Sequence, residues 1–389
     1  MPATSPTQGV VLSGGGSRAA YEAGVLKALM SGNVPGTTPP VVPDIYSGTS
    51  GGAFNAALMA SFWDENSLDA VARCENAWLS SLAGQGRFLE NGAYRLRGNL
   101  LDLFDGARGA HQASSPAQIL FGDQVFLFRE LLPRLIGLAS FDRSIDERIS
   151  DLVDLSAFFD TSPMEKAIRE CIALEKIHCS PRRLYVATTD WATGRLKVFA
   201  KEDFQATDAY KLIMASCALP GVFPPVEIGG ELYQDGGVIM NTPLKPAIDA
   251  GAEVLYAIYM DPDPGLFPTR KLHASLDVVT RALAINAASI MNNDIERAAQ
   301  VNRIVAIKSQ YPGMTPDTIL ALEGRSPDRT PHRLVTIHRF HPNTEFGGLL
   351  GALDFGIDNI RSLIKQGFED ASRHDCRAAH CILPKSKKS

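Results

Sequence analysis

The pentapeptide Gly48-Thr49-Ser50-Gly51-Gly52 constrains this chain most, because it has the G-x-S-x-G pattern of a nucleophile elbow. Such an elbow is a sharp turn from a strand into a helix that exposes the serine hydroxyl on a strained backbone, with glycines where a Cβ atom would clash. Residues 41–46 before it read as a short buried strand, and residues 53–60 after it favour a helix. Glycine-rich turns with a serine also occur without catalytic roles, so the motif alone leaves both interpretations open.

A second glycine-rich loop lies upstream of the elbow. A predicted strand at residues 8–12 leads into Gly14-Gly15-Gly16-Ser17-Arg18, and a predicted helix at residues 19–30 follows. Three consecutive glycines present bare N–H groups, which suits an anion or an oxyanion. The loop lacks the Walker A pattern, and it is a poor dinucleotide fingerprint because no acidic residue ends a second strand about 20 residues further on. The alternative is a tight strand–helix turn without a ligand.

Composition excludes some classes of function. The net charge of −5 over 389 residues argues against a nucleic-acid partner. The first residues lack the charged and apolar regions of a signal peptide, and no apolar run is long enough to span a bilayer. We therefore expect a cytoplasmic protein that is able to contact a membrane surface peripherally. Six scattered cysteines without a C-x-x-C pair read as reduced thiols: Cys74, Cys171, Cys179, Cys217, Cys376 and Cys381.

The rest of the chain alternates strand and helix signals. Residues 62–180 read as mostly helical and irregular, with apolar stripes that pack on the core; a lid or lipid-entry role for residues 100–128 is the minority interpretation. Thr242 and Pro243 are expected to cap a helix that ends at Ala250. Further strands are predicted at residues 183–190, 195–199, 253–260, 303–308 and 333–338, and further helices at residues 209–217, 272–301 and 349–373.

Four separated segments, taken together, resemble the patatin-like phospholipase family. Their order and spacing match that family, and the resemblance is clear over residues 9–61 and 183–260, reaches to about residue 370, and is thin over residues 62–180. Ala19 departs from the pattern, because the family's glycine loop usually ends in glycine. The segments are Gly14 to Ala19, Gly48 to Gly52, Ala215 to Pro225, and Asp235-Gly236-Gly237 with Asn241-Thr242-Pro243.

The resemblance implies an α/β protein with a three-layer α/β/α patatin-like fold, a central mostly parallel sheet and a helical insertion. We expect a single catalytic domain over residues 1–389. The expected parts are a core at 9–61 and 183–310, an insertion at 62–180 that could form a lid, a closing segment at 311–373 and a tail at 374–389.

The resemblance also implies a lipid acyl hydrolase of the phospholipase A type, with a serine–aspartate dyad, an acyl-enzyme intermediate and no cofactor. Its substrate would be a lipid or phospholipid acyl ester. Ser50 would be the nucleophile and Asp235 its base, and partial burial would raise the pKa of Asp235. The remaining implied residues are the oxyanion-hole set near Arg18, namely Gly14, Gly15, Gly16 and the weaker candidate Gly51, and the motif glycines Gly48, Gly52, Gly236 and Gly237.

Two other functions stay open. An α/β-hydrolase triad would recruit a histidine that follows Asp235, but the elbow comes too early in the chain for the strands that such a fold places first. A catalytically silent lipid- or anion-binding module would use the same glycine loop, and the presence of both Ser50 and Asp235 argues against it. The rival nucleophiles are Ser216 and Cys217, and the histidines available to a triad are His273, His332, His338 and His341.

Two smaller features lie near the C-terminal end. His374, Cys376, His380 and Cys381 crowd together, but their spacing is not a standard pair of zinc-ligand couples, so we expect an incidental surface cluster and no metal site. Residues 345–355 are apolar and glycine-rich. Core packing ahead of the last helix is the favoured interpretation, because a membrane-surface helix would carry a basic polar face.

Overall fold

A computed structural model describes most of the chain. The described residues are 6–37, 40–84, 91–96, 159–205, 207–260, 275–311, 333–344, 346–347 and 351–383, with single positions between 313 and 321. The proposed lid segment at 100–128, His273, His332 and the last residues of the tail lie outside this part of the chain.

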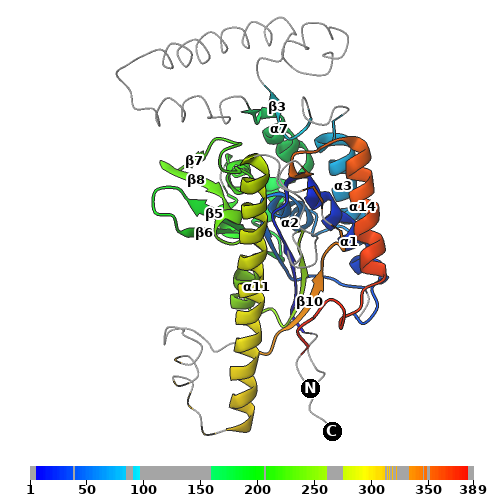
Figure 1. Cartoon of the computed structure of the whole chain (residues 1–389), viewed down its shortest axis with the longest axis vertical. Coiled ribbons are helices and arrows are strands. Elements are labelled where there is room, and N and C mark those ends of the chain that lie inside the picture. The colour runs from blue at the N-terminus through cyan, green and yellow to red at the C-terminus, as the bar shows by residue number, and fades with distance from the viewer. Residues whose placement is uncertain are drawn as a thin grey trace, which may run out of the picture.

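The architecture is built on one eight-stranded sheet with the order β10-β9-β1-β2-β5-β8-β7, and β6 also pairs with β5 (Figure 1). The run from β10 to β5 is parallel, whereas β6 and β8 are antiparallel to β5, and β7 is antiparallel to β8. The strands are β1 (Gln8–Leu12), β2 (Ile45–Thr49), β5 (Arg183–Asp190), β6 (Leu196–Ala200), β7 (Val226–Ile228), β8 (Glu231–Asp235), β9 (Val254–Ile258) and β10 (Thr336–Phe340). A separate small pair joins β3 (Arg95–Leu96) and β4 (Phe159–Asp160).

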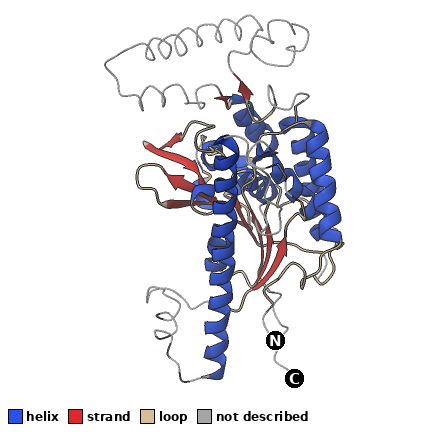
Figure 2. Cartoon of the chain, viewed as in Figure 1, coloured by secondary structure: helices blue, strands red, loops and turns tan. Residues whose placement is uncertain are grey.

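Helices cover both faces of the sheet (Figure 2). The described helices are α1 (Ala20–Met30), α2 (Gly51–Ser61), α3 (Ser67–Asn76), α7 (Ser162–Cys171), α8 (Leu174–Ile177), α9 (Tyr210–Ser216), α10 (Leu244–Asp249), α11 (Ser275–Gln310) and α14 (Ile357–Ser372). Short 3-10 turns span Gly16–Ala19, Lys201–Asp203 and Gly236–Val238, and a π-helical stretch spans Ala77–Leu82.

The two faces of the central strands belong to two hydrophobic clusters. In β1, Val10 and Leu12 pack with α1, α2, α3 and α14, whereas Val11 between them packs with α10 and α11. In β9, Tyr256 and Ile258 likewise face the first cluster, and Leu255 faces the second. This alternation follows from the two-residue period of a strand, and it explains why nearly every residue of these central strands is apolar. The three-layer α/β/α arrangement with a mostly parallel sheet is confirmed.

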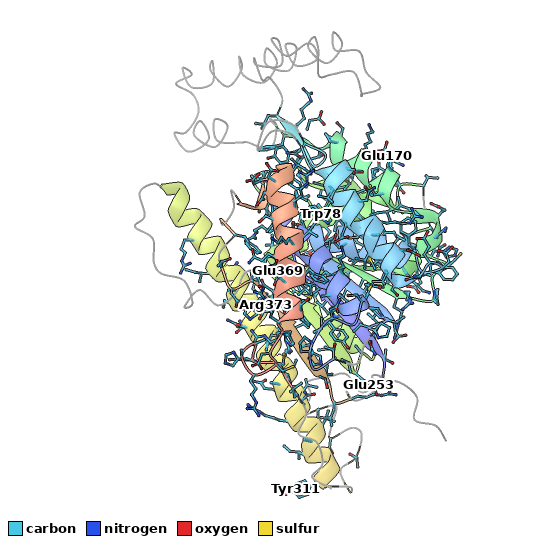
Figure 3. All side chains as sticks on the ribbon, turned by 90° about the vertical axis from the view of Figure 1, so that its right-hand side faces the viewer. Trp78, Glu170, Glu253, Tyr311, Glu369 and Arg373 are labelled. Carbon is cyan, nitrogen blue, oxygen red and sulfur yellow. The ribbon has the colours of Figure 1, made fainter. Side chains whose placement is uncertain are left out.

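Helices α1 and α14 bring distant parts of the sequence together at very close range. A Cβ atom on Gly24 would lie 1.9 Å from the carbonyl oxygen of Ile364, and one on Gly367 would lie 2.0 Å from that of Tyr21. Figure 3 shows α14 across one face of the molecule with Glu369 and Arg373 towards its end, whereas Tyr311 lies at the far end of α11. Glycine on both helices is therefore a condition of this contact.

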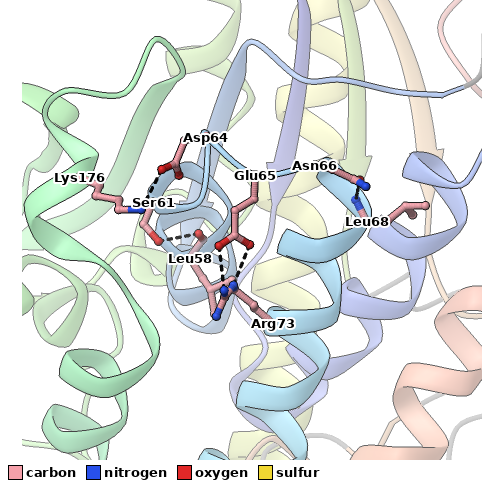
Figure 4. A network of polar contacts seen from close by, with 8 residues as sticks. All are labelled: Leu58, Ser61, Asp64, Glu65, Asn66, Leu68, Arg73 and Lys176. Atoms are coloured by element: carbon pink, nitrogen blue, oxygen red, sulfur yellow. Dashed lines mark hydrogen bonds and ion pairs between the residues drawn. The ribbon is translucent and has the colours of Figure 1, made fainter.

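A polar network fixes the turn between α2 and α3 (Figure 4). The Arg73 guanidinium donates to both carboxylate oxygens of Glu65 at 2.8 Å, and Lys176 of α8 pairs with Asp64 at 2.9 Å. Asn66 caps α3 by accepting from the Leu68 N–H group at 2.8 Å. The cap supplies a partner for one of the N–H groups that the start of a helix leaves unpaired.

Three of the local predictions are wrong. Residues 303–308 form the last part of α11 and are not a strand. The strand before the elbow is β2, which overlaps residues 41–46 only at Ile45 and Tyr46 and runs on into the motif itself. Pro243 occupies the N-cap of α10, and the buried Thr242 hydroxyl has no hydrogen-bond partner among the described residues.

Nothing in the described part of the chain has both the length and the apolar character of a bilayer-spanning helix.

Candidate active site

Ser50 lies at a strained turn between β2 and α2. Its backbone has φ 55° and ψ −128°, which is an uncommon conformation for a residue with a side chain. The glycines around it are required by close approach: a Cβ atom on Gly48 would lie 2.3 Å from the Gly52 carbonyl oxygen, and one on Gly52 would lie 2.4 Å from that of Leu12. The strand–turn–helix context expected for the G-x-S-x-G motif is thus present.

Ser216 stabilises this turn through a hydrogen bond with the backbone of Ser50. The side chain is fully buried, and its hydroxyl accepts a hydrogen bond from the Ser50 N–H group at 2.9 Å while donating to the Ala187 carbonyl at 2.7 Å. The elbow is thereby connected to β5 through the end of α9. The sequence suggests Ser216 only as a rival nucleophile, but its hydroxyl is engaged in two hydrogen bonds inside the protein, so Ser216 instead supports the backbone of Ser50.

Asp235 reaches Ser50 because of the strand register. Thr49 pairs with Ala187 of β5, and Asp235 pairs with the next residue, Thr188. Because β6 pairs with both Ala187 and Thr188 along the opposite edge of β5, β2 and β8 lie on the same edge and their last residues meet end to end. Because β8 is antiparallel to β5, the carboxylate comes from a strand that enters the sheet in the opposite direction to β2.

The Asp235 carboxylate is buried but not isolated. It accepts a hydrogen bond from the Gly237 N–H group at 2.7 Å, and its main chain is fixed by Ala218 and Thr189. Burial raises the pKa of Asp235 from its ordinary value of 3.8 to about 6, whereas the hydrogen bonds from Gly237 and from the Ser50 hydroxyl lower the pKa. A carboxylate with this pKa is a far better proton acceptor at neutral pH than an exposed aspartate.

The glycine loop lies beside the same two residues. Gly15 and Gly16 open the short 3-10 turn at Gly16–Ala19, and Gly51 opens α2. The first N–H groups of a helix have no partner within it, so these positions can offer donors. Ala19 stands where the expected glycine-loop pattern usually has a glycine. Its methyl group is accommodated because a glycine faces it: a Cβ atom on Gly51 would lie 2.7 Å from that methyl group.

One cavity of about 520 Å³ contains this arrangement. Ser50, Asp235, Gly14, Gly15, Gly16, Arg18, Gly51 and Gly237 line it, whereas Gly48, Gly52 and Gly236 shape the backbone behind it. The walls away from the serine are mostly apolar. They include Phe54, Trp78, Leu82, Met164, Leu219, Phe223, Leu353 and Phe355.

These apolar walls were missed from the sequence. Trp78, which stacks on Phe355 with ring centroids 6.2 Å apart, and Met164 come from the region in which no site residues were expected. Phe355 and Leu353 come from the glycine-rich segment 345–355, whose described part packs inside the protein as favoured. A helical spacing of large apolar residues predicts burial, but it does not distinguish core from cavity wall.

The histidines available to a triad and the alternative nucleophile Cys217 are less well placed for catalysis than Asp235 and Ser50. Among the described residues, no histidine lines the cavity: His338 stacks on Tyr256 and His341 on Tyr259. Cys217 does line it, but burial, and then the negative charge of Asp235, raise the pKa of its thiol far above the ordinary value. A thiol that stays protonated is a poor nucleophile.

The C-terminal cluster is arranged differently from the prediction. His374, Cys376 and Cys381 lie together, but the fourth member is His338 of β10, and His380 is exposed and outside the group. His338 and His374 are buried, so the group is not on the surface as expected. All six cysteines are free.

The fold and the cavity define an α/β protein with a serine at a strand–helix elbow and a buried aspartate beside it. The family model for patatin-like phospholipases matches residues 10–248, and the chain belongs to that family.

Individual relatives match over short segments only. Uncharacterized NTE family proteins of Mycobacterium bovis and Mycobacterium tuberculosis are 28% identical over 95 residues, which make up 24% of this chain and 25% of each relative. A patatin-like phospholipase domain-containing protein of Coccidioides immitis is 52% identical over 54 residues, 14% of this chain and 6% of the relative.

Two solved structures align along most of the chain. VipD from Legionella pneumophila aligns over 95% of this chain and 67% of its own, with 15% identity and a TM-score of 0.39. The type III effector protein ExoU aligns over 95% of this chain and 53% of its own, with 16% identity and a TM-score of 0.31. Both scores are too low to add to the family assignment.

Proposed function

We propose that this protein is a lipid acyl hydrolase that uses a Ser50–Asp235 dyad. The observation that carries the proposal is the meeting of the strained elbow serine with a buried aspartate in a cavity with apolar walls. Family membership supports the reaction class.

In the proposed reaction, the Asp235 carboxylate accepts the proton of the Ser50 hydroxyl as its oxygen attacks the ester carbonyl carbon. The resulting oxyanion accepts hydrogen bonds from backbone N–H groups at Gly15, Gly16 and Gly51. As the intermediate collapses, Asp235 returns its proton to the departing alcohol and an acyl-serine ester remains. A water molecule then repeats the sequence, giving up a proton to Asp235, and the carboxylic acid leaves Ser50 with its hydroxyl restored.

The lining of the cavity supports a lipid ester as the substrate. Its aromatic and aliphatic walls suit an acyl chain, because burial of each methylene group contributes about 0.8 kcal/mol. The polar side, with Thr189, Gln234 and Asn241, is where a glycerol or head-group portion would lie. Contact with a membrane surface at the cavity mouth is part of this proposal, and the exposed Trp191 lies among the lining residues.

The decisive experiment is active-site labelling. A fluorophosphonate should form one covalent adduct, which mass spectrometry of the digested protein should locate on Ser50, and Ser50→Ala should abolish both the adduct and hydrolysis. Purified protein should be tested on phospholipids, neutral lipids and short p-nitrophenyl esters. An adduct on Cys217 would overturn the dyad, and a folded protein that gives neither adduct nor hydrolysis would be the silent binding module.

A further inference from the structure

Four potential metal ligands converge at the edge of the sheet remote from the antiparallel strands. His338 lies on the edge strand β10, and His374, Cys376 and Cys381 follow the end of α14. Figure 1 shows β10 beside this C-terminal segment, and Figure 3 labels Arg373, the residue that precedes His374 at the end of α14. None of the four lines the cavity that contains Ser50.

Three of the distances between ligand atoms match the edges of a tetrahedral site. The Cys376 sulfur lies 3.4 Å from His338 Nδ1 and 3.4 Å from His374 Nε2, and the Cys381 sulfur lies 3.5 Å from the same His374 nitrogen. All four ligand atoms lie within 4.8 Å of one another. A zinc ion with Zn–S bonds of about 2.3 Å and Zn–N bonds of about 2.0 Å requires sulfur–nitrogen edges of about 3.5 Å.

Surrounding contacts position three of the four ligands, His338, His374 and Cys381. His338 stacks on Tyr256 at 5.4 Å and His374 stacks on Phe340 at 4.4 Å between ring centroids. The Arg339 N–H group donates to the Cys381 sulfur at 3.2 Å, as backbone N–H groups do to metal-bound thiolates. These contacts are independent of the residues around Ser50.

A main-chain pairing also sets the register between the two halves of the group. Ile337 and Ile382 exchange N–H···O bonds of 2.9 Å, which places Cys381 opposite His338. The segment that carries three ligands therefore adds to the open edge of β10.

We propose that His338, His374, Cys376 and Cys381 bind one zinc ion. Two thiolates and two imidazoles fill all four positions of a tetrahedron, which is the pattern of a structural site and not of a catalytic one. The ion would fasten the end of the chain to β10, where an unpaired strand edge would otherwise be exposed. The proposal does not depend on the acyl hydrolase activity.

The test is metal analysis of the full chain, purified without chelators. About one zinc ion per chain is expected in the unmodified protein, and it should be lost from Cys376→Ser and from Cys381→Ser. His380→Ala and Cys179→Ser are the matched controls, because these exposed residues lie outside the group, and both should keep the metal.

A second measurement needs only the unmodified protein, in case the serine variants fail to fold. Exchange of zinc for Co²⁺ should give the intense visible absorption of a tetrahedral thiolate site, and chelation should lower the melting temperature until zinc is returned. Absence of zinc after incubation with the ion would overturn the proposal, as would full zinc content in Cys376→Ser. A Cys376–Cys381 disulfide in the freshly purified chain, found by mass spectrometry, would also overturn it.

Discussion

Asp235 is a buried carboxylate whose ionised form is required for the proposed catalysis but lowers the stability of the folded protein. As the proposed base it must be ionised, whereas burial favours its neutral form and raises its pKa to about 6. The ionisation of this one side chain therefore affects both the activity and the stability of the protein.

The first prediction concerns the pH dependence of activity. Because only the ionised carboxylate can accept the Ser50 proton, kcat/KM should rise with pH through an apparent pKa of about 6 and then stay level. At one pH unit below that midpoint, activity should be about tenfold lower than on the plateau. The measurement is hydrolysis of a soluble short-chain ester, which avoids effects of lipid surfaces. A profile that stays level down to pH 4.5 would contradict the assignment.

The second prediction concerns stability. The folded pKa of Asp235 lies above its ordinary value, so its contribution to folding is favourable at low pH and is lost as the pH rises through about 6. Asp235→Asn should therefore be inactive, yet more stable than the unmodified protein at pH 8. A shift of about two pKa units corresponds to at most about 3 kcal/mol. Urea unfolding at pH 8 and pH 4 measures the difference, which should vanish at the lower pH.

At the scale of elements, the elbow depends on the end of α9. Ser216→Ala would leave the Ser50 N–H group and the Ala187 carbonyl buried without their partner, at a cost of about 1–3 kcal/mol each. We expect lower stability and a kcat that falls more than KM changes, because the hydroxyl of Ser50 would be less well positioned. Unfolding curves and ester kinetics give both quantities.

The matched control is Ser61→Ala. Ser61 is equally buried, but its hydroxyl donates only to the Leu58 carbonyl within its own helix. If the two variants have the same kcat, Ser216 has no special part in positioning the elbow.

At the scale of the whole molecule, the contact of α1 with α14 joins the two ends of the described chain. Gly24→Ala and Gly367→Ala should each destabilise the protein by roughly 1–3 kcal/mol or more, because a methyl group would meet the backbone of the other helix. Ser362→Ala, on an exposed position of α14, is the control. Denaturant unfolding at fixed pH tests this, and stabilities equal to the control would show that the helices tolerate a wider spacing.

The sequence predicted those parts in which a local motif determines a local shape. The strand–loop–helix at Gly14, the elbow at Ser50 and the strands predicted at 183–190 and 195–199, which form β5 and β6, are of this kind, and they are confirmed as elements. The roles of Ser50 and Asp235 remain predictions, although the structure brings the two residues together.

What could not be predicted depends on contacts between distant segments. Residues 303–308 are rich in β-branched residues and suit a short strand, but they continue a helix already formed by the preceding residues. The fourth member of the histidine–cysteine group is His338 and not the predicted His380 for a similar reason. His380 is close to the cysteines in sequence, but His338 is brought to them by the pairing of the C-terminal segment with β10. The apolar cavity walls likewise come from segments that are separate in the sequence.

The order of the two dyad residues along the chain affects how the protein is made. During synthesis, Ser50 and the glycine loop are made before β5, β6 and α9, whereas Asp235 is made only after them, with β8. If the dyad proposed here is correct, a nascent or interrupted chain that stops before β8 carries the serine without its base. On that proposal such a fragment lacks hydrolytic activity, which would appear only after β8 has been made and most of the central sheet is present.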